Sequence, residues 1–164
     1  MLCLIFVGYP SEEFVLVTLH TLTRLAAHAL VDVPDQVELL LTHLEEDPRK
    51  TVMRQVLSDL RYLTSSDHAH LWTASNVESL LAFAEKSVGE EGEAIVGALS
   101  IFCDLVKNTS ISKLQPLNAD SSIIKLTQQC SYSTQLTVAG RATQVFLVNS
   151  QCAVLDKSHL TIFF

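Results

Sequence analysis

The chain has 164 residues, of which 48% are hydrophobic and 18% are charged, a balance that excludes intrinsic disorder because disordered chains combine low hydrophobicity with high charge. With only 5 Gly and 4 Pro, a collagen-like or low-complexity polymer is excluded as well. Acidic residues outnumber basic ones by 18 to 11, for a net charge of −7, which disfavours a nucleic-acid binder because such affinity comes mainly from Lys and Arg.

Both ends of the chain are apolar. Residues 1–10 are predicted to form an apolar N-terminal extension, which is too short to span a bilayer and lacks the early Lys or Arg of a signal peptide. Residues 157–164 are predicted to form a C-terminal tail that ends in Phe163 and Phe164. Two apolar ends without a polar capping helix indicate a fragment of a longer chain.

The first half of the chain predicts three helices. Apolar residues recur at three- and four-residue intervals from Ser11 to Val31, as on one face of an amphipathic helix. Pro34 suits the first turn of a second helix. Asp47 and Pro48 are typical of an N-cap and a first helical residue, and they predict the start of a third helix.

Helical spacing continues in the second half. A polar stretch over residues 64–74 is followed by Ser75 and Glu78, which predict a capping box at the start of a fourth helix. Glycines end that helix at residues 89–92. The helical spacing of Ile95, Leu99, Phe102 and Val106 predicts a fifth helix, and a loop is expected over residues 108–120. Two further helices are predicted, one around residues 123–130 and one from about residue 134. A strand over residues 143–148 is the weaker interpretation, because the surrounding spacing is helical.

The predicted helices repeat with a period of 43 residues. Five apolar columns carry this spacing: Val52, Ile95 and Val138; Val56, Leu99 and Ala142; Leu60, Cys103 and Phe146; Val37, Leu80 and Ile123; Leu40, Phe83 and Leu126. The period lies within the roughly 40–47 residues of armadillo and HEAT units. Residues 11–156 are therefore predicted to form an all-α, armadillo/HEAT-type α-solenoid of stacked helix pairs, a half repeat plus three pairs. Chance matches within an ordinary amphipathic bundle are the less favoured explanation.

The sequence contains no complete motif for a catalytic, nucleotide-binding or metal site. No nucleophile elbow, Walker A loop or dinucleotide-binding glycine motif occurs. His68 and His70 form the only close histidine pair, and no further ligand completes a zinc site beside them. The four cysteines are widely spaced and predict reduced thiols rather than a disulfide framework. We therefore expect no enzyme activity, no metal and no cofactor.

One helix face is a candidate partner surface. Lys50, Arg54 and Arg61 fall on the same side of the third predicted helix, where they could contact RNA or an acidic partner. A solvated face with balanced charge is the favoured alternative. The acidic residues expected to balance it are Glu45, Glu46 and Asp59.

Residues 21–28 (TLTRLAAH), 33–37 (VPDQV), 39–41 (LLL) and 46–50 (EDPRK) resemble the Integrator complex subunit 7 family, most specifically between Tyr9 and Leu63. The resemblance implies a non-catalytic α-solenoid scaffold in a nuclear assembly associated with RNA polymerase II. That assembly processes small nuclear RNA 3′ ends and attenuates transcription, its endonuclease and phosphatase lie in other subunits, and this subunit is linked to the DNA-damage checkpoint.

The partners implied are other Integrator subunits, with RNA polymerase II reached indirectly and without a small molecule, a membrane or direct RNA contact. The implied location is the nucleus, with the cytoplasm as a second location. The alternative is a peptide-binding armadillo/HEAT adaptor of transport or signalling, which needs regularly placed Asn, Trp or acidic residues on a concave face. Trp72 is the only Trp and falls in a predicted loop, which disfavours that alternative.

Overall fold

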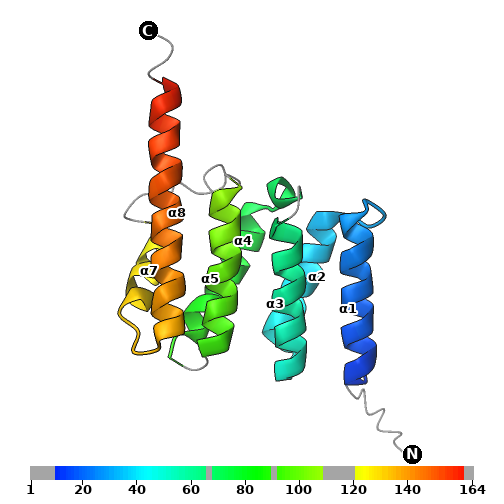
Figure 1. The fold of residues 1–164 in the computed structure, drawn as a ribbon. Helices are drawn as coiled ribbons and strands as arrows, with labels where there is room; N and C mark the ends of the chain where they lie inside the picture. The colour runs from blue at the N-terminus through cyan, green and yellow to red at the C-terminus, as the bar shows by residue number, and fades with distance from the viewer. Residues whose placement is uncertain (1–9, 66–67, 90–91, 109–120, 161–164) are drawn as a thin grey trace, which may run out of the picture.

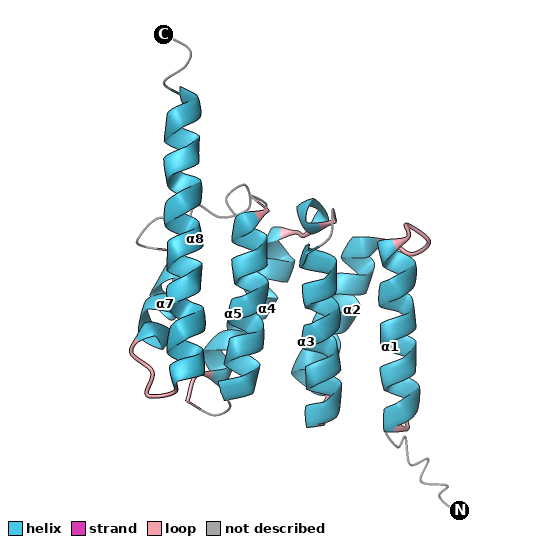
Figure 2. Ribbon diagram, viewed as in Figure 1, coloured by secondary structure: helices cyan, strands magenta, loops and turns pink. Residues whose placement is uncertain are grey.

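A computed structural model describes residues 10–65, 68–89, 92–108 and 121–160 of the chain, with side chains described up to residue 150 (Figure 1). Within these ranges the backbone forms helices and no strand (Figure 2), so the prediction of an all-α fold is confirmed. The elements are α1 (Glu12–Ala27), α2 (Val33–Glu46), α3 (Lys50–Ser65), the 3-10 helix η1 (Ala69–Leu71), α4 (Ala74–Ser87), α5 (Gly92–Lys107), α7 (Ser122–Ser131) and α8 (Leu136–Leu160).

The helices form two layers. Figure 1 shows α1, α3, α5 and α8 side by side in a front layer, with α2, α4 and α7 in a rear layer. In the front layer α1 packs on α3, α3 on α5 and α5 on α8; in the rear layer α2 packs on α4 and α4 on α7. Across the two layers α1 packs on α2, α2 on α3, α4 on α5 and α7 on α8. This two-layered helical array is consistent with an α-solenoid.

The core lies between the two layers. One cluster of buried apolar side chains extends from Val15 in α1 to Val148 in α8, so the helices share a continuous interior. Gln36 and Thr23 form a buried polar pair within it: the Gln36 amide donates to Thr23 Oγ1 at 3.0 Å and to the Leu19 carbonyl at 3.3 Å. These bonds satisfy groups that would otherwise be costly to bury, and they fix α2 against α1.

The first helix begins as predicted and ends early. Ser11 is the N-cap of α1, and its hydroxyl accepts a hydrogen bond from Phe14 N. The predicted end at Val31 is wrong, because Ala29 adopts a left-handed conformation with φ of 57°. Leu30 N then donates to Leu25 O and Ala29 N donates to Ala26 O, the two bonds of a Schellman motif.

The predicted start of the third helix is also wrong. Asp47 is the C-cap of α2, and α3 begins at Lys50. Asp47 is extended, with φ of −89° and ψ of 115°, as expected for a residue that precedes a proline. Its carboxylate accepts hydrogen bonds from Arg49 N at 3.0 Å and from Arg49 Nε at 2.9 Å. The bonds from the Arg49 side chain are the largest cause of a lowered Asp47 pKa.

The capping box of the fourth helix lies two residues before its predicted position. Thr73 is the N-cap of α4, its hydroxyl accepts from Asn76 N at 3.2 Å, and Asn76 Oδ1 accepts from Thr73 N at 3.0 Å. Ser75 and Glu78 lie within the helix. The box forms with Asn in the place that Glu or Gln usually takes, which is why the sequence pattern missed it.

The remaining elements follow the predictions closely. α4 ends at Ser87 and α5 begins at Gly92, so the break at residues 89–92 is confirmed. α7 and α8 coincide with the two helices predicted near the end, and residues 143–148 are helical. The predicted loop over residues 108–120 lies outside the described residues except for Asn108. The division at residues 10 and 156 remains a prediction.

Candidate partner-binding surfaces

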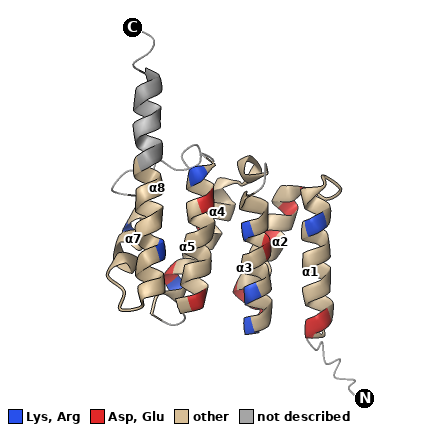
Figure 3. Cartoon of the chain, viewed as in Figure 1, with Lys and Arg blue, Asp and Glu red and all other residues tan. Residues whose placement is uncertain are grey.

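The predicted basic surface lies on α3, beside α5. Lys50, Arg54 and Arg61 are all exposed, and Figure 3 shows basic residues along α3 with acidic residues on the neighbouring helices. The two arginines are seven residues apart, so they project from one side of α3, as the sequence predicted. We refer to the boundary between these two helices as the α3–α5 seam.

Arg54 crosses the α3–α5 seam to Glu93. Its Nε lies 2.7 Å from Glu93 Oε1 and its Nη2 lies 2.8 Å from Oε2, a bidentate geometry that fits a guanidinium to a carboxylate. The hydrogen bonds from Arg54 lower the pKa of Glu93, and the positive charges of Arg54 and Lys50 act in the same direction. Because both side chains are about half exposed, at 55% and 53%, solvent weakens this pair.

Arg61 crosses the same seam about two helical turns further along α3. Its Nε lies 3.1 Å from Asp104 Oδ2, and Lys107 Nζ lies 3.9 Å from Asp104 Oδ1. The compensating carboxylates are therefore Glu93 and Asp104 of α5, and not the residues expected from the sequence. The basic surface is largely a charge-paired seam between two helices.

Asp59, one of the residues expected to balance this surface, faces α1 instead. Its side chain is only 3% exposed, and Oδ1 lies 3.0 Å from both His20 Nδ1 and Gln55 Nε2. Other polar links join the same two helices: the Thr51 hydroxyl donates to Glu12 Oε1 at 2.6 Å, and the Arg24 guanidinium lies 5.2 Å from the centre of the Tyr62 ring. The polar links across the α1–α3 boundary are thus mainly hydrogen bonds.

The candidate histidines do not converge. His68 Nε2 donates to the Ala27 carbonyl at 3.1 Å, and His70 is exposed at η1. In the part of the chain that the structure describes, no group of three or more His, Cys, Asp or Glu is placed to hold a metal. Cys103 and Cys130 are buried, and burial raises the pKa of both thiols, which disfavours the reactive thiolate.

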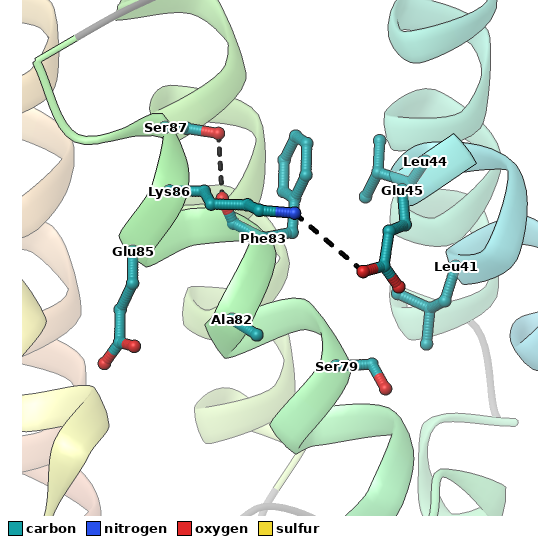
Figure 4. Close-up of a pocket in the computed structure, with 9 residues that line it drawn as sticks. All are labelled: Leu41, Leu44, Glu45, Ser79, Ala82, Phe83, Glu85, Lys86 and Ser87. Carbon is teal, nitrogen blue, oxygen red and sulfur yellow. Dashed lines mark hydrogen bonds and ion pairs between the residues drawn. The ribbon is translucent and has the colours of Figure 1, made fainter. Parts of the chain in front are cut away.

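Sequence analysis missed a groove between α2 and α4, on the rear layer. It consists of a hollow of about 600 Å³ beside a smaller one of about 200 Å³. Leu41, Glu45 and Ser79 line both hollows, and both are open to solvent. Figure 4 shows the larger hollow with Leu41, Leu44 and Glu45 on one side and the α4 residues on the other. We call the two hollows together the α2–α4 groove.

Small side chains on α4 create the α2–α4 groove. Ser75, Ser79 and Ala82 lie four and three residues apart on one helical face, and all three border the groove. Since they are short, α2 and α4 leave open space between them. This spacing of small, exposed residues is the signal in the sequence that could have revealed the groove.

None of the described helices is both long enough and apolar enough to cross a membrane.

Comparison with known proteins gives a consistent set of matches. The profile of the family described as "Integrator complex subunit 7, N-terminal" matches residues 1–161. Integrator complex subunit 7 of Danio rerio is 39% identical over 146 residues, covering 84% of this chain and 15% of the relative. The Homo sapiens protein of that name is 34% identical over 163 residues, covering 94% of this chain and 16% of the relative. The chain thus spans about 16% of the length of such curated relatives.

Proposed function

Since the chain belongs to the Integrator complex subunit 7 family, we propose that it is a non-catalytic scaffold that docks other Integrator subunits on its helical surfaces. The observation that carries the proposal is the family match over residues 1–161, joined to relatives that are named as subunits of that complex. Exposed charged side chains engaged in ion pairs between helices, such as Arg54 with Glu93, favour a structural role for this segment.

We further propose that the array is an armadillo/HEAT-type solenoid with a period of 43 residues. Among the fifteen residues of the five apolar columns, only Phe83 and Phe146 are not fully buried, and both are half-buried. The Arg61–Asp104 ion pair also joins positions 43 residues apart in neighbouring helices. Both observations support equivalent positions in successive helix pairs.

The wider roles follow from the family. We infer that the segment supports small nuclear RNA 3′-end processing and transcription attenuation by RNA polymerase II, with a part in the DNA-damage checkpoint. The expected location is the nucleus, with the cytoplasm as a second location. The polymerase would be contacted through other subunits. The net charge of −7 favours protein partners over direct RNA contact.

The adaptor alternative lacks an exposed Trp, one of the residue types with which such an adaptor would recognise a peptide. Trp72 is only 2% exposed and belongs to the hydrophobic core, so it cannot stack on a bound peptide. No second function is therefore proposed.

Affinity purification of the tagged chain from nuclear extract, followed by mass spectrometry, tests the proposal. We expect several Integrator subunits to be enriched over a tagged helical control protein of similar size and charge. Circular dichroism of the bait shows whether it is folded. A folded, helical bait that enriches no Integrator subunit would contradict the scaffold function.

A further inference from the structure

The α2–α4 groove has an apolar floor. Leu41 and Leu44 are buried below it, at 7% and 5% exposure, and Phe83 is half-buried. Ala82 adds an exposed methyl group. An aliphatic side chain from another molecule would be removed from water over this floor, and such burial is favourable.

The rim of the groove is acidic. Glu38 and Glu45 on α2 are seven residues apart, which places them about 10 Å apart along the helix axis. On α4 the rim carries Glu85 and Lys86. Lys86 Nζ lies 3.9 Å from Glu45 Oε1, and since both side chains are about three-quarters exposed, this pair is weak (Figure 4).

The two α2 carboxylates on the rim are available to a partner: that of Glu38 has no ion pair among the described residues, and that of Glu45 has only the weak one with Lys86. Glu38 borders the smaller hollow and Glu45 borders both. Glu85 also lines a hollow on the α7 side of α4, beside Lys125, and Figure 4 shows its side chain pointing away from α2. The helices as a whole are acidic too: α2 and α4 together carry six Asp or Glu residues and a single Lys.

We propose that the α2–α4 groove docks a basic amphipathic helix from a partner subunit. The helix would lay aliphatic side chains over Leu41, Leu44 and Phe83, and would place Lys or Arg beside the carboxylates of Glu38 and Glu45. Charge complementarity selects the partner and the apolar floor supplies its contact area. The inference rests on the proposed scaffold function and names the chemistry of one docked partner.

A designed peptide tests the groove directly. The probe is an Ala-rich, fluorescein-labelled helical peptide with two Lys seven residues apart and Leu residues between them on the same face. Two matched peptides replace the Lys with Glu or the Leu with Ser. Fluorescence anisotropy with the full chain should show binding of the first peptide and at least about tenfold weaker binding of the other two.

Variants of the chain test whether the peptide binds in the α2–α4 groove. The double variant Glu38→Lys/Glu45→Lys should weaken binding of the Lys/Leu peptide about tenfold, because two attractions become repulsions. Ala82→Trp should also weaken it by filling the groove. Glu78→Lys is the matched control, since Glu78 is exposed on α4 but does not line the groove; it should change binding by less than about twofold.

Three results would overturn the inference. If Glu78→Lys weakens binding as much as the double variant, only net charge is being measured. If Ala82→Trp leaves binding unchanged in a chain of normal helicity, the peptide binds elsewhere. If a single-stranded RNA oligonucleotide displaces the peptide, the surface binds nucleic acid.

Repeating the affinity purification with the double variant separates the two proposals. Loss of a subset of the subunits recovered with the unaltered chain supports docking in the groove. If both chains recover the same subunits in equal amounts, the groove inference fails while the scaffold function stands. If the unaltered chain recovers none, the scaffold function fails, and with it the assignment of the groove to an Integrator partner.

Discussion

Ala29 is the only non-glycine residue with a positive φ in the described part of the chain, at 57°. It occupies the position after the α1 C-cap where a Schellman motif usually has Gly, because a Cβ is strained in the left-handed region. The two hydrogen bonds of the motif hold it there. Ala29 therefore terminates α1 in a backbone conformation that is unfavourable for alanine.

Ala29→Gly should stabilise the protein. Relief of the strain in the left-handed conformation should raise the free energy of unfolding by about 1 kcal/mol. The greater loss of backbone entropy when Gly folds offsets part of this gain. Ala27→Gly is the control, since it places Gly in the helix and should lower the free energy of unfolding by about 0.5–1 kcal/mol. Urea denaturation followed by circular dichroism measures both. A lower free energy of unfolding for Ala29→Gly would contradict the strain argument.

At the scale of the helices, the sequence predicts the features that depend on one helix alone, namely its approximate position and its buried face. Apolar spacing located every described α-helix, because each buries one face in the common core. Boundaries were less predictable, since they depend on local hydrogen bonds that several residues can supply, as with Thr73 in place of Ser75. Trp72 lies outside the α-helices, as predicted, yet is buried, because burial there is decided by tertiary packing.

The candidate surface was predictable only in part. The shared face of Lys50, Arg54 and Arg61 follows from helical spacing. Their partners, Glu93 and Asp104, are set by which helix lies next to α3, and a single helix carries no such information. The α2–α4 groove likewise depends on the separation of two helices.

Two helical glycines test how closely the front-layer helices pack. A Cβ at Gly97 in α5 would lie 2.7 Å from Leu57 Cδ1 and 3.3 Å from Leu57 Cγ of α3. Gly97→Leu should therefore lower the free energy of unfolding by about 1–3 kcal/mol through overpacking. Gly140 in α8 is the matched position, because nothing lies within 4 Å of its Cβ.

Gly140→Leu should raise the free energy of unfolding by about 0.5–1 kcal/mol, because Leu is the better helix former. Both variants are compared by urea denaturation at the same protein concentration. Equal effects of the two substitutions would show that α3 and α5 do not approach each other closely at Gly97.

For the molecule as a whole, the continuous core predicts cooperative unfolding. Trp72 reports on the η1 region, and Ile123 in α7 is fully buried nearer the α8 end of the array. Ile123→Val should lower the free energy of unfolding by about 0.5–1.5 kcal/mol. It should shift the denaturation midpoint measured by Trp72 fluorescence as much as the midpoint measured by circular dichroism. A fluorescence midpoint that does not move would mean that the two ends unfold separately.

The front-layer links also bear on the order in which the protein assembles during synthesis. Thr51 bonds to Glu12 across 39 positions, Arg61 to Asp104 across 43, and the Asn108 amide to the Thr64 carbonyl across 44. Each boundary is therefore complete soon after its second helix leaves the ribosome. The α1–α3 boundary can close while α7 and α8 are still to be translated, so the growing chain can bury its apolar faces one helix pair at a time.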